Sequence, residues 1–155
     1  TSEGPRGEPL IDPVIEYGNL GLVGPEHDPP GIGISIIGGY VYRGADIPEL
    51  DGTYVFGDWS TSFTSPDGFL MTAQPGGEGE MWEITIEQSL PHFVLGFGED
   101  SAGELYVLTT DNTGPTGETG RVYQVVANGD PIEEAPAEPA DDETEDTDAD
   151  SEGDG

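Results

Sequence analysis

Apolar residues in this chain gather into short runs that are separated by clusters of Gly, Pro, Asp and Ser. Runs rich in Ile, Val, Tyr and Phe with turn residues between them predict β-strands rather than helices. The runs cover residues 34–43, 53–58, 69–73, 81–86, 93–97, 104–109 and 121–126. The pattern therefore predicts an all-β fold.

Two stretches of the chain match each other at a constant offset of 52 positions. The matched pairs are Arg43-Gly44 with Leu95-Gly96, Tyr54-Val55 with Tyr106-Val107, and Gly68 with Gly120. A repeat of about 50 residues that contains four short strands has the size of one β-propeller blade. The first four runs predict one blade, and the last three predict the beginning of a second.

The fourth strand of the second unit is missing from the pattern. It is expected near position 133, where Glu133-Glu134-Ala135-Pro136 gives no strand signal. A closed propeller commonly completes its last blade with a strand from its own N-terminal end, because an open blade leaves an unpaired edge. The chain also starts at Thr1 without a signal-peptide pattern. We therefore expect the C-terminal part of a longer propeller.

Charge separates a folded body from an acidic tail. From Asp130 to Gly155 the chain has 13 acidic residues and neither a basic nor an aromatic one, so almost nothing is available to form a core. We expect residues 1–12 to be a lead-in or loop and residues 13–126 to form the propeller part. Residues 127–155 are expected to be a disordered, low-complexity tail.

The body is strongly acidic as well. Residues 1–129 carry 20 acidic side chains against three arginines, and the chain has no lysine. Molar salt shortens the Debye length to about 3 Å and screens the repulsion between carboxylates, so the composition favours a halophilic protein. An acidic extracellular domain from an ordinary source is the alternative. Either composition argues against nucleic acid as a partner, because binding to phosphates depends on Lys and Arg.

Two further classes of feature are absent from the sequence. No run reaches the roughly 18 to 20 apolar residues of a membrane-spanning helix. There is no cysteine, which excludes a disulfide framework and a cysteine-based metal site.

Four small motifs suggest chemistry, and each has a plainer interpretation that we prefer. His27 lies between two carboxylates, but no second ligand stands at a metal-site spacing, which favours a surface loop. His92 opens a strand whose neighbours are apolar, which favours a structural role. Residues 148–153 imitate the start of a calcium loop that lacks its twelfth-position Glu. Residues 76–79 (GGEG) occur once, which favours a tight hairpin over a calcium-binding array.

Four segments carry a resemblance to a known family: residues 34–44 (ISIIGGYVYRG), 48–59 (PELDGTYVFGDW), 97–100 (FGED) and 103–109 (GELYVLT). In order and spacing they resemble the C-terminal part of the glucose/sorbosone dehydrogenase family, over roughly residues 13–126. Members are six-bladed β-propellers, many of which use pyrroloquinoline quinone and calcium to oxidise aldose sugars. The resemblance implies about two C-terminal blades of such a propeller. The acidic composition and residues 114–120 are similar to the haloarchaeal branch.

The resemblance also implies a set of cofactor-binding positions, which fall at Trp59, Ser60, His92 and Thr110 in this sequence. Quinone-dependent members have a basic residue where Ser60 stands, and two arginines where His92 and Val94 stand. Three lost charge-assisted hydrogen bonds, each of about 1.5 to 3 kcal/mol, weaken cofactor binding unless other blades compensate. The family's general-base histidine belongs to earlier blades, outside this chain, and the metal ligands are unknown.

Two classes of function remain open. The first is an exported dehydrogenase that oxidises aldoses at C1, with pyrroloquinoline quinone and calcium as cofactors, a sugar as substrate and a separate electron acceptor. The second is a non-catalytic propeller that displays its loops for binding, since one fold serves many functions. Both interpretations place the protein outside the cell or at its surface. The identity of the sugar, the electron acceptor and the oligomeric state are not specified by these residues.

Overall fold

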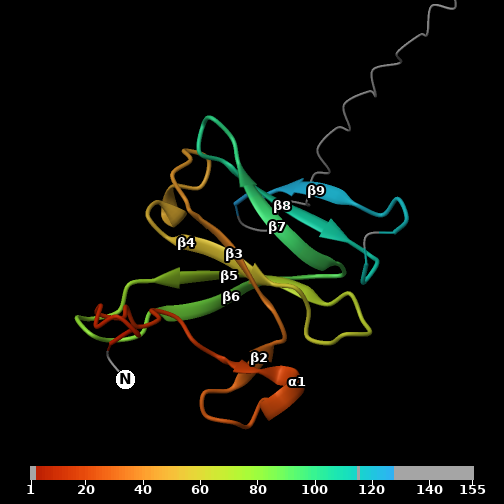
Figure 1. Ribbon diagram of the computed structural model, residues 1–155. Helices are drawn as coiled ribbons and strands as arrows, with labels where there is room; N and C mark the ends of the chain where they lie inside the picture. The colour runs from red at the N-terminus through yellow and green to blue at the C-terminus, as the bar shows by residue number, and fades with distance from the viewer. Residues whose placement is uncertain (1–2, 115, 128–155) are drawn as a thin grey trace, which may run out of the picture.

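The structure is a computed structural model, and it describes residues 3–114 and 116–127. Its main elements form two antiparallel sheets (Figure 1), which confirms the predicted all-β class. The first sheet has the order β3 (Ile36–Val41), β4 (Tyr54–Asp58), β5 (Gly68–Gln74) and β6 (Glu83–Leu90). The second has the order β7 (Phe93–Glu99), β8 (Leu105–Thr110) and β9 (Arg121–Gln124).

All seven predicted strands are present, and within each sheet consecutive strands lie next to each other. Two short elements precede them, the parallel pair β1 (Gly18–Asn19) and β2 (Gly31–Gly33), with the one-turn helix α1 (Leu20–Val23) between. A short 3-10 helix, η1 (Pro48–Leu50), lies between β3 and β4. In the part of the chain that the structure describes, no helix is long and apolar enough to cross a bilayer.

The predicted constant offset of 52 holds for β4 and β8 and is wrong for the other strands. The third strands, β5 and β9, correspond at an offset of 51, since Val55 pairs with Thr72 and Val107 with Tyr123. Val55 of β4 pairs with Tyr40, whereas its counterpart Val107 of β8 pairs with Phe97. The first strands therefore correspond at an offset of 57 rather than 52. The reason is the connection that follows them, which has 12 residues between β3 and β4 and only five between β7 and β8. The true counterpart of Arg43 is Asp100.

The core lies mainly between the two sheets. Two clusters of buried side chains fill this space, one made of Tyr42, Ile47, Val55 and Leu105, the other of Leu70, Leu90, Val94 and Val107. A third cluster, made of Phe56, Phe69, Met71 and Ala73, covers the opposite face of the first sheet, where Ile15 and Tyr17 pack against it. The central strands of the first sheet, β4 and β5, are therefore buried on both faces.

Because both sheets are antiparallel, their loops gather at two ends. The connections β3–β4 and β7–β8 lie at one end, which we call the Tyr42 end. The connections β4–β5 (residues 59–67), β6–β7 (91–92) and β8–β9 (111–120) lie at the other, which we call the Trp59 end. Position 133, the motif at 148–153 and all of the expected tail except Ala127 lie outside the described residues.

A buried carboxylate ties the two sheets together at the Tyr42 end. Glu104, just before β8, accepts hydrogen bonds from the Tyr42 hydroxyl at 2.6 Å and from the amides of Ala45 and Asp46 at 2.8 and 3.1 Å. The bond from Tyr42 lowers the pKa of Glu104. Burial and the same bond raise the pKa of Tyr42 to about 12. The geometry therefore favours an ionised Glu104.

Candidate functional site

The four residues predicted to contact a cofactor all lie at the Trp59 end. Trp59 and Ser60 follow β4, His92 precedes β7, and Thr110 ends β8. Two backbone hydrogen bonds join the sheets here, from the Val94 amide to the Trp59 carbonyl at 3.2 Å and from the Gly68 amide to the His92 carbonyl at 2.8 Å. The structure therefore brings the four residues to one place, and their role as cofactor contacts stays a prediction.

Ser60 is fully buried and organises the β4–β5 loop. Its hydroxyl donates to the Ser65 carbonyl at 2.6 Å and accepts from the amides of Ser62 and Asp67 at 3.3 and 3.2 Å. The Ser62 hydroxyl then accepts from the amides of Thr64 and Ser65. Hydroxyl-to-backbone bonds of this kind favour turns. Ser60 thus holds the loop in one conformation and directs its own polar atom inward.

An aromatic stack rises from the sheets to the surface at this end. Trp59 stacks on the buried ring of Phe93, with ring centroids 4.3 Å apart. Trp59 also contacts Phe63 of the β4–β5 loop, with ring centroids 6.0 Å apart in a tilted geometry. Phe63 is 70% exposed. The loop that Ser60 and Ser62 fix therefore presents a large apolar ring to solvent.

His92 has a partner on each of its ring nitrogens. Nδ1 lies 2.5 Å from Oδ1 of Asp111, and Nε2 lies 3.1 Å from the hydroxyl of Tyr123, whose ring stacks on the imidazole. With neutral His92, this pattern assigns the proton to Nδ1 and makes Nε2 the acceptor from Tyr123. The other carboxylate oxygen of Asp111 accepts from Arg121 at 2.9 Å. Arg121 and then His92 lower the pKa of Asp111.

Thr110 takes part in a second internal network, which shapes the β8–β9 loop. Its hydroxyl lies 3.0 Å from that of Thr119 and accepts from the Asn112 amide at 3.3 Å. The Asn112 side chain bridges to the Thr119 hydroxyl and to the Thr116 carbonyl. Val94, which stands where the resembled family has a second arginine, is fully buried between the sheets. The site as described therefore offers a ligand few unpaired polar groups.

Asp58 is a key residue that the sequence analysis missed. Its carboxylate is fully buried beneath the Trp59 end and accepts from the amides of Ile34, Ser35 and Ser60 and from the Tyr17 hydroxyl at 2.7 Å. Burial, and next the bond to Asp58, raise the pKa of Tyr17. An aspartate that ends an apolar strand is the signal that marks it in the sequence. Asp58 joins the segment before β1, the residues just before β3 and the β4–β5 loop.

Two of the remaining motifs, His27 and residues 76–79, lie in a surface loop and in a hairpin connection. His27 is exposed, with Nδ1 3.2 Å from the Pro29 carbonyl. Residues 76–79 lie in the connection of the β5–β6 hairpin, where Gly79 has φ +79°. The hairpin is confirmed, although its connection spans eight residues and is not tight. The described residues contain no group of three or more His, Asp or Glu side chains that could hold a metal ion.

Comparison with known proteins gives a partial match. No protein-family model matches the chain. The chain is similar to Hedgehog-interacting protein of Mus musculus, with 31% identity over 100 residues, and to that of Homo sapiens, with 32% identity over 100 residues. The aligned region is 59% of this chain and only 13% of either relative. The chain thus matches a small part of much longer proteins.

Proposed function

We propose that this chain is part of an exported β-propeller protein that binds a macromolecular partner through the loops at the Trp59 end and is not itself catalytic. One observation carries the proposal: at three of the four predicted cofactor positions, the polar side-chain atoms bind partners within the chain. Both nitrogens of His92, the hydroxyl of Ser60 and that of Thr110 have partners within the chain. A general base or a cofactor contact needs a free donor or acceptor directed at the ligand.

The surface of the Trp59 end supports a binding role. Phe63 is exposed on a loop that hydrogen bonds already hold in place, so little conformational entropy is lost when a partner covers it. Aromatic residues that fill a pocket on a partner supply much of the energy of protein interfaces. The similar curated proteins are named for an interaction. The acidic composition favours a partner with a basic surface.

The arrangement of the sheets supports the propeller. Two antiparallel sheets with consecutive strands pack against each other, and their first strands, β3 and β7, are neighbours. In a propeller the first strand of each blade lies nearest the central channel, so neighbouring blades meet in this way. We propose that the two sheets are the last two blades of a six-bladed ring.

The binding role can be tested with three versions of the chain immobilised in molar salt. These are the unchanged chain, Phe63→Ser, and Met81→Ser, which alters a partly exposed apolar residue in the β5–β6 connection at the opposite end. We expect a protein from the secreted fraction of the source cells to be retained by the unchanged chain and by Met81→Ser, and lost with Phe63→Ser. Equal retention by all three, or by none, contradicts the proposal.

A second candidate is the quinone-dependent sugar dehydrogenase. It is favoured by the convergence of the four family positions at one end of the sheets. Pyrroloquinoline quinone would supply the redox chemistry, but Ser60, His92 and Thr110 offer its carboxylates groups that already have partners within the chain, and Val94 offers no polar group. Earlier blades would have to hold the cofactor. Titration of the longer protein with the quinone and calcium, followed by an aldose and a dye, tests this candidate: saturable binding at micromolar quinone supports it, and its absence rejects it.

A further inference from the structure

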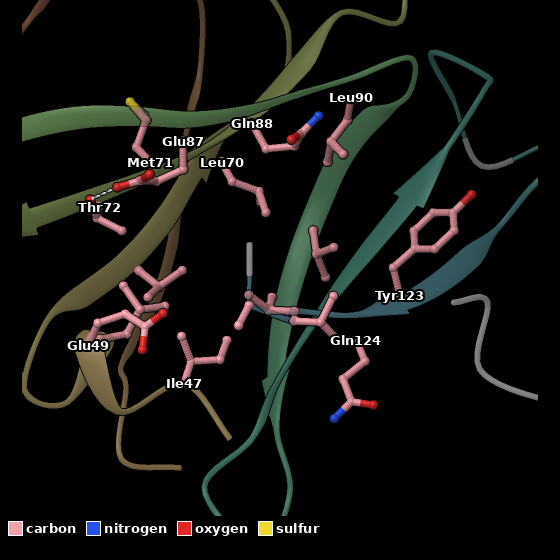
Figure 2. A pocket seen from close by; sticks show the side chains of 16 residues that line it. Ile47, Glu49, Leu70, Met71, Thr72, Glu87, Gln88, Leu90, Tyr123 and Gln124 are labelled. Carbon is pink, nitrogen blue, oxygen red and sulfur yellow. Dashed lines mark hydrogen bonds between the residues drawn. The ribbon is translucent and has the colours of Figure 1, made fainter. Parts of the chain in front are cut away.

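A groove of about 340 Å³ lies between the two sheets, with Leu70 and Leu90 on one wall and Val107 on the other (Figure 2). Tyr123 and Gln124 of β9 also line it, so the groove borders the place where the sequence pattern expects a fourth strand. The groove therefore belongs with the completion of the second sheet. The loops of the Trp59 end are a separate surface, and they lie together at one end of the two sheets (Figure 1).

Two aromatic rings adjoin at the Trp59 end, and both are held in place. Trp59 stacks on the buried ring of Phe93, and it contacts Phe63 with ring centroids 6.0 Å apart and ring planes inclined by 48°. The hydrogen bonds of Ser60 and Ser62 fix the loop that carries Phe63. The face of an aromatic ring has a negative potential, so two rings that are fixed beside each other attract a cation.

The surroundings of the two rings are polar and acidic. Among the described residues of the three loops at this end, Phe63 is the one large apolar side chain that is exposed. The same loops contain three carboxylates, Asp67, Asp111 and Glu118, and neither a lysine nor an arginine. Asp111 has partners within the chain, whereas Asp67 and Glu118 are exposed. An apolar side chain of a partner would therefore contact one ring, whereas a cationic side chain would also gain the attraction of the carboxylates.

The β4–β5 loop brings one of these carboxylates close to the exposed ring. The Thr61 amide donates to the Asp67 carbonyl at 3.2 Å, which places Asp67 opposite Thr61 at the base of the loop. Phe63 follows Thr61 by two residues, so the Cα atoms of these two residues are at most about 7 Å apart. A single long side chain can therefore lie on the Phe63 ring and reach Asp67.

We propose that the Trp59 end binds an arginine side chain of its partner protein, with the guanidinium stacked on Phe63 beside Trp59 and its N–H groups directed at Asp67. The inference rests on the binding role proposed above and names the chemical group that the partner presents. Arginine fits better than lysine, because a planar guanidinium stacks on an aromatic face and still donates hydrogen bonds in its own plane.

The probe is the peptide acetyl-Gly-Arg-Gly-amide, compared with peptides that have lysine or the neutral analogue citrulline in place of the arginine. The whole chain is labelled with 5-fluorotryptophan, and fluorine NMR reports on Trp59 and on the second tryptophan, Trp82, which lies in the β5–β6 connection at the opposite end. At the lowest salt that keeps the chain folded, we expect the arginine peptide to shift the Trp59 resonance saturably and to leave that of Trp82 unchanged. Its affinity should be about five-fold higher than that of the citrulline peptide.

Matched variants assign the effect to the ring and to the carboxylate. Phe63→Leu keeps an apolar side chain without an aromatic face, and it should weaken binding of the arginine peptide about three-fold, whereas Phe63→Tyr should preserve binding. Asp67→Asn should weaken binding of the arginine peptide and leave that of the citrulline peptide as it was. Met81→Ser, at the opposite end, should change neither affinity.

Retention of a secreted protein by the immobilised chain distinguishes failure of this inference from failure of the binding role. A protein that is lost with Phe63→Ser but retained by Phe63→Leu leaves the binding role in place and overturns the arginine contact. Binding of the arginine peptide at Trp59 without any retained protein contradicts the binding role alone. A Trp59 resonance that does not move, equal affinities for the arginine and citrulline peptides, or tighter binding of the lysine peptide overturns the arginine contact.

Discussion

The two sheets have the same strand order and very different surroundings. The first has four strands, and its outer face is covered by Ile15 and Tyr17. The second has three, and its outer face leaves Leu95, Leu108 and Val122 exposed by 52%, 39% and 41%. The difference shows that two sheets with the same strand order can differ in burial. Burial depends on which other segments pack against the outer face of each sheet. Within the described residues, the second sheet therefore has neither a fourth strand nor a cover over its outer face.

The largest effect on stability is expected at Asp58, whose carboxylate binds the Tyr17 hydroxyl and so holds the segment before β1 against the first sheet. Asp58→Ala removes an acceptor that four groups share and leaves the Tyr17 hydroxyl and three amides without it. We expect the free energy of unfolding to fall by about 3 to 5 kcal/mol, because unpaired buried polar groups are costly.

Chemical denaturation in molar salt measures this change. Asp67→Ala in the same loop is the control, since its side chain is exposed, and it should cost at most about 0.5 kcal/mol. Equal losses in the two variants would show that Asp58 stabilises the first sheet no more than an exposed residue of the same loop does.

A second prediction separates the folded body from the acidic tail. Raising KCl from about 0.1 to 2 M should raise the melting temperature by roughly 10 °C, because salt screens repulsion among the body's carboxylates. Truncation after Ala127 should preserve this trend, since residues 1–127 contain 20 of the 33 acidic residues. A melting temperature that stays constant or falls with salt speaks against the halophilic interpretation.

The hydrogen bonds that Glu104 accepts at the Tyr42 end make a smaller contribution to stability, and this contribution depends on pH. Glu104→Gln should cost about 1 to 2 kcal/mol at pH 7, because it weakens three hydrogen bonds to a buried carboxylate. The folded-state pKa of Glu104 is lowered, so its contribution is present above the unfolded pKa of about 4.3 and is lost as pH falls through the folded value.

Unfolding curves between pH 7 and pH 3 test that sign. The unchanged chain should lose stability more steeply on acidification than Glu104→Gln, and the exposed control Glu99→Gln should follow the unchanged chain. Parallel curves for all three would show that Glu104 is not ionised in the fold.

The smallest effect is expected on the bare face of the second sheet. Leu108→Thr should change the stability of this chain by about 0.5 kcal/mol or less, because the side chain is partly exposed and Thr suits a strand. In the longer protein the same substitution should cost about 1 to 2 kcal/mol, because a neighbouring blade would bury Leu108. The same cost in both proteins means that nothing covers this face.

The strands were predictable because apolar runs and turn residues mark them, and β4, β5, β7 and β8 lie within a few residues of their expected positions. The offset between the first strands, β3 and β7, was not predictable, because it depends on the lengths of the connections that follow them. The convergence of Trp59, Ser60, His92 and Thr110 was implied by the family resemblance. The partners of His92 could not be read from sequence, since Asp111 and Tyr123 are 19 and 31 residues away.

The most direct test of the claim that the Trp59 end is built for structure and binding is the stability of His92→Ala. If the imidazole serves to join Asp111 and Tyr123, its removal lowers the free energy of unfolding by about 1.5 to 3 kcal/mol, measured by denaturation in molar salt without any added cofactor. Residues kept for a ligand commonly contribute nothing to stability or reduce it. Unchanged or increased stability in His92→Ala would therefore contradict the account and favour a role of His92 in cofactor binding.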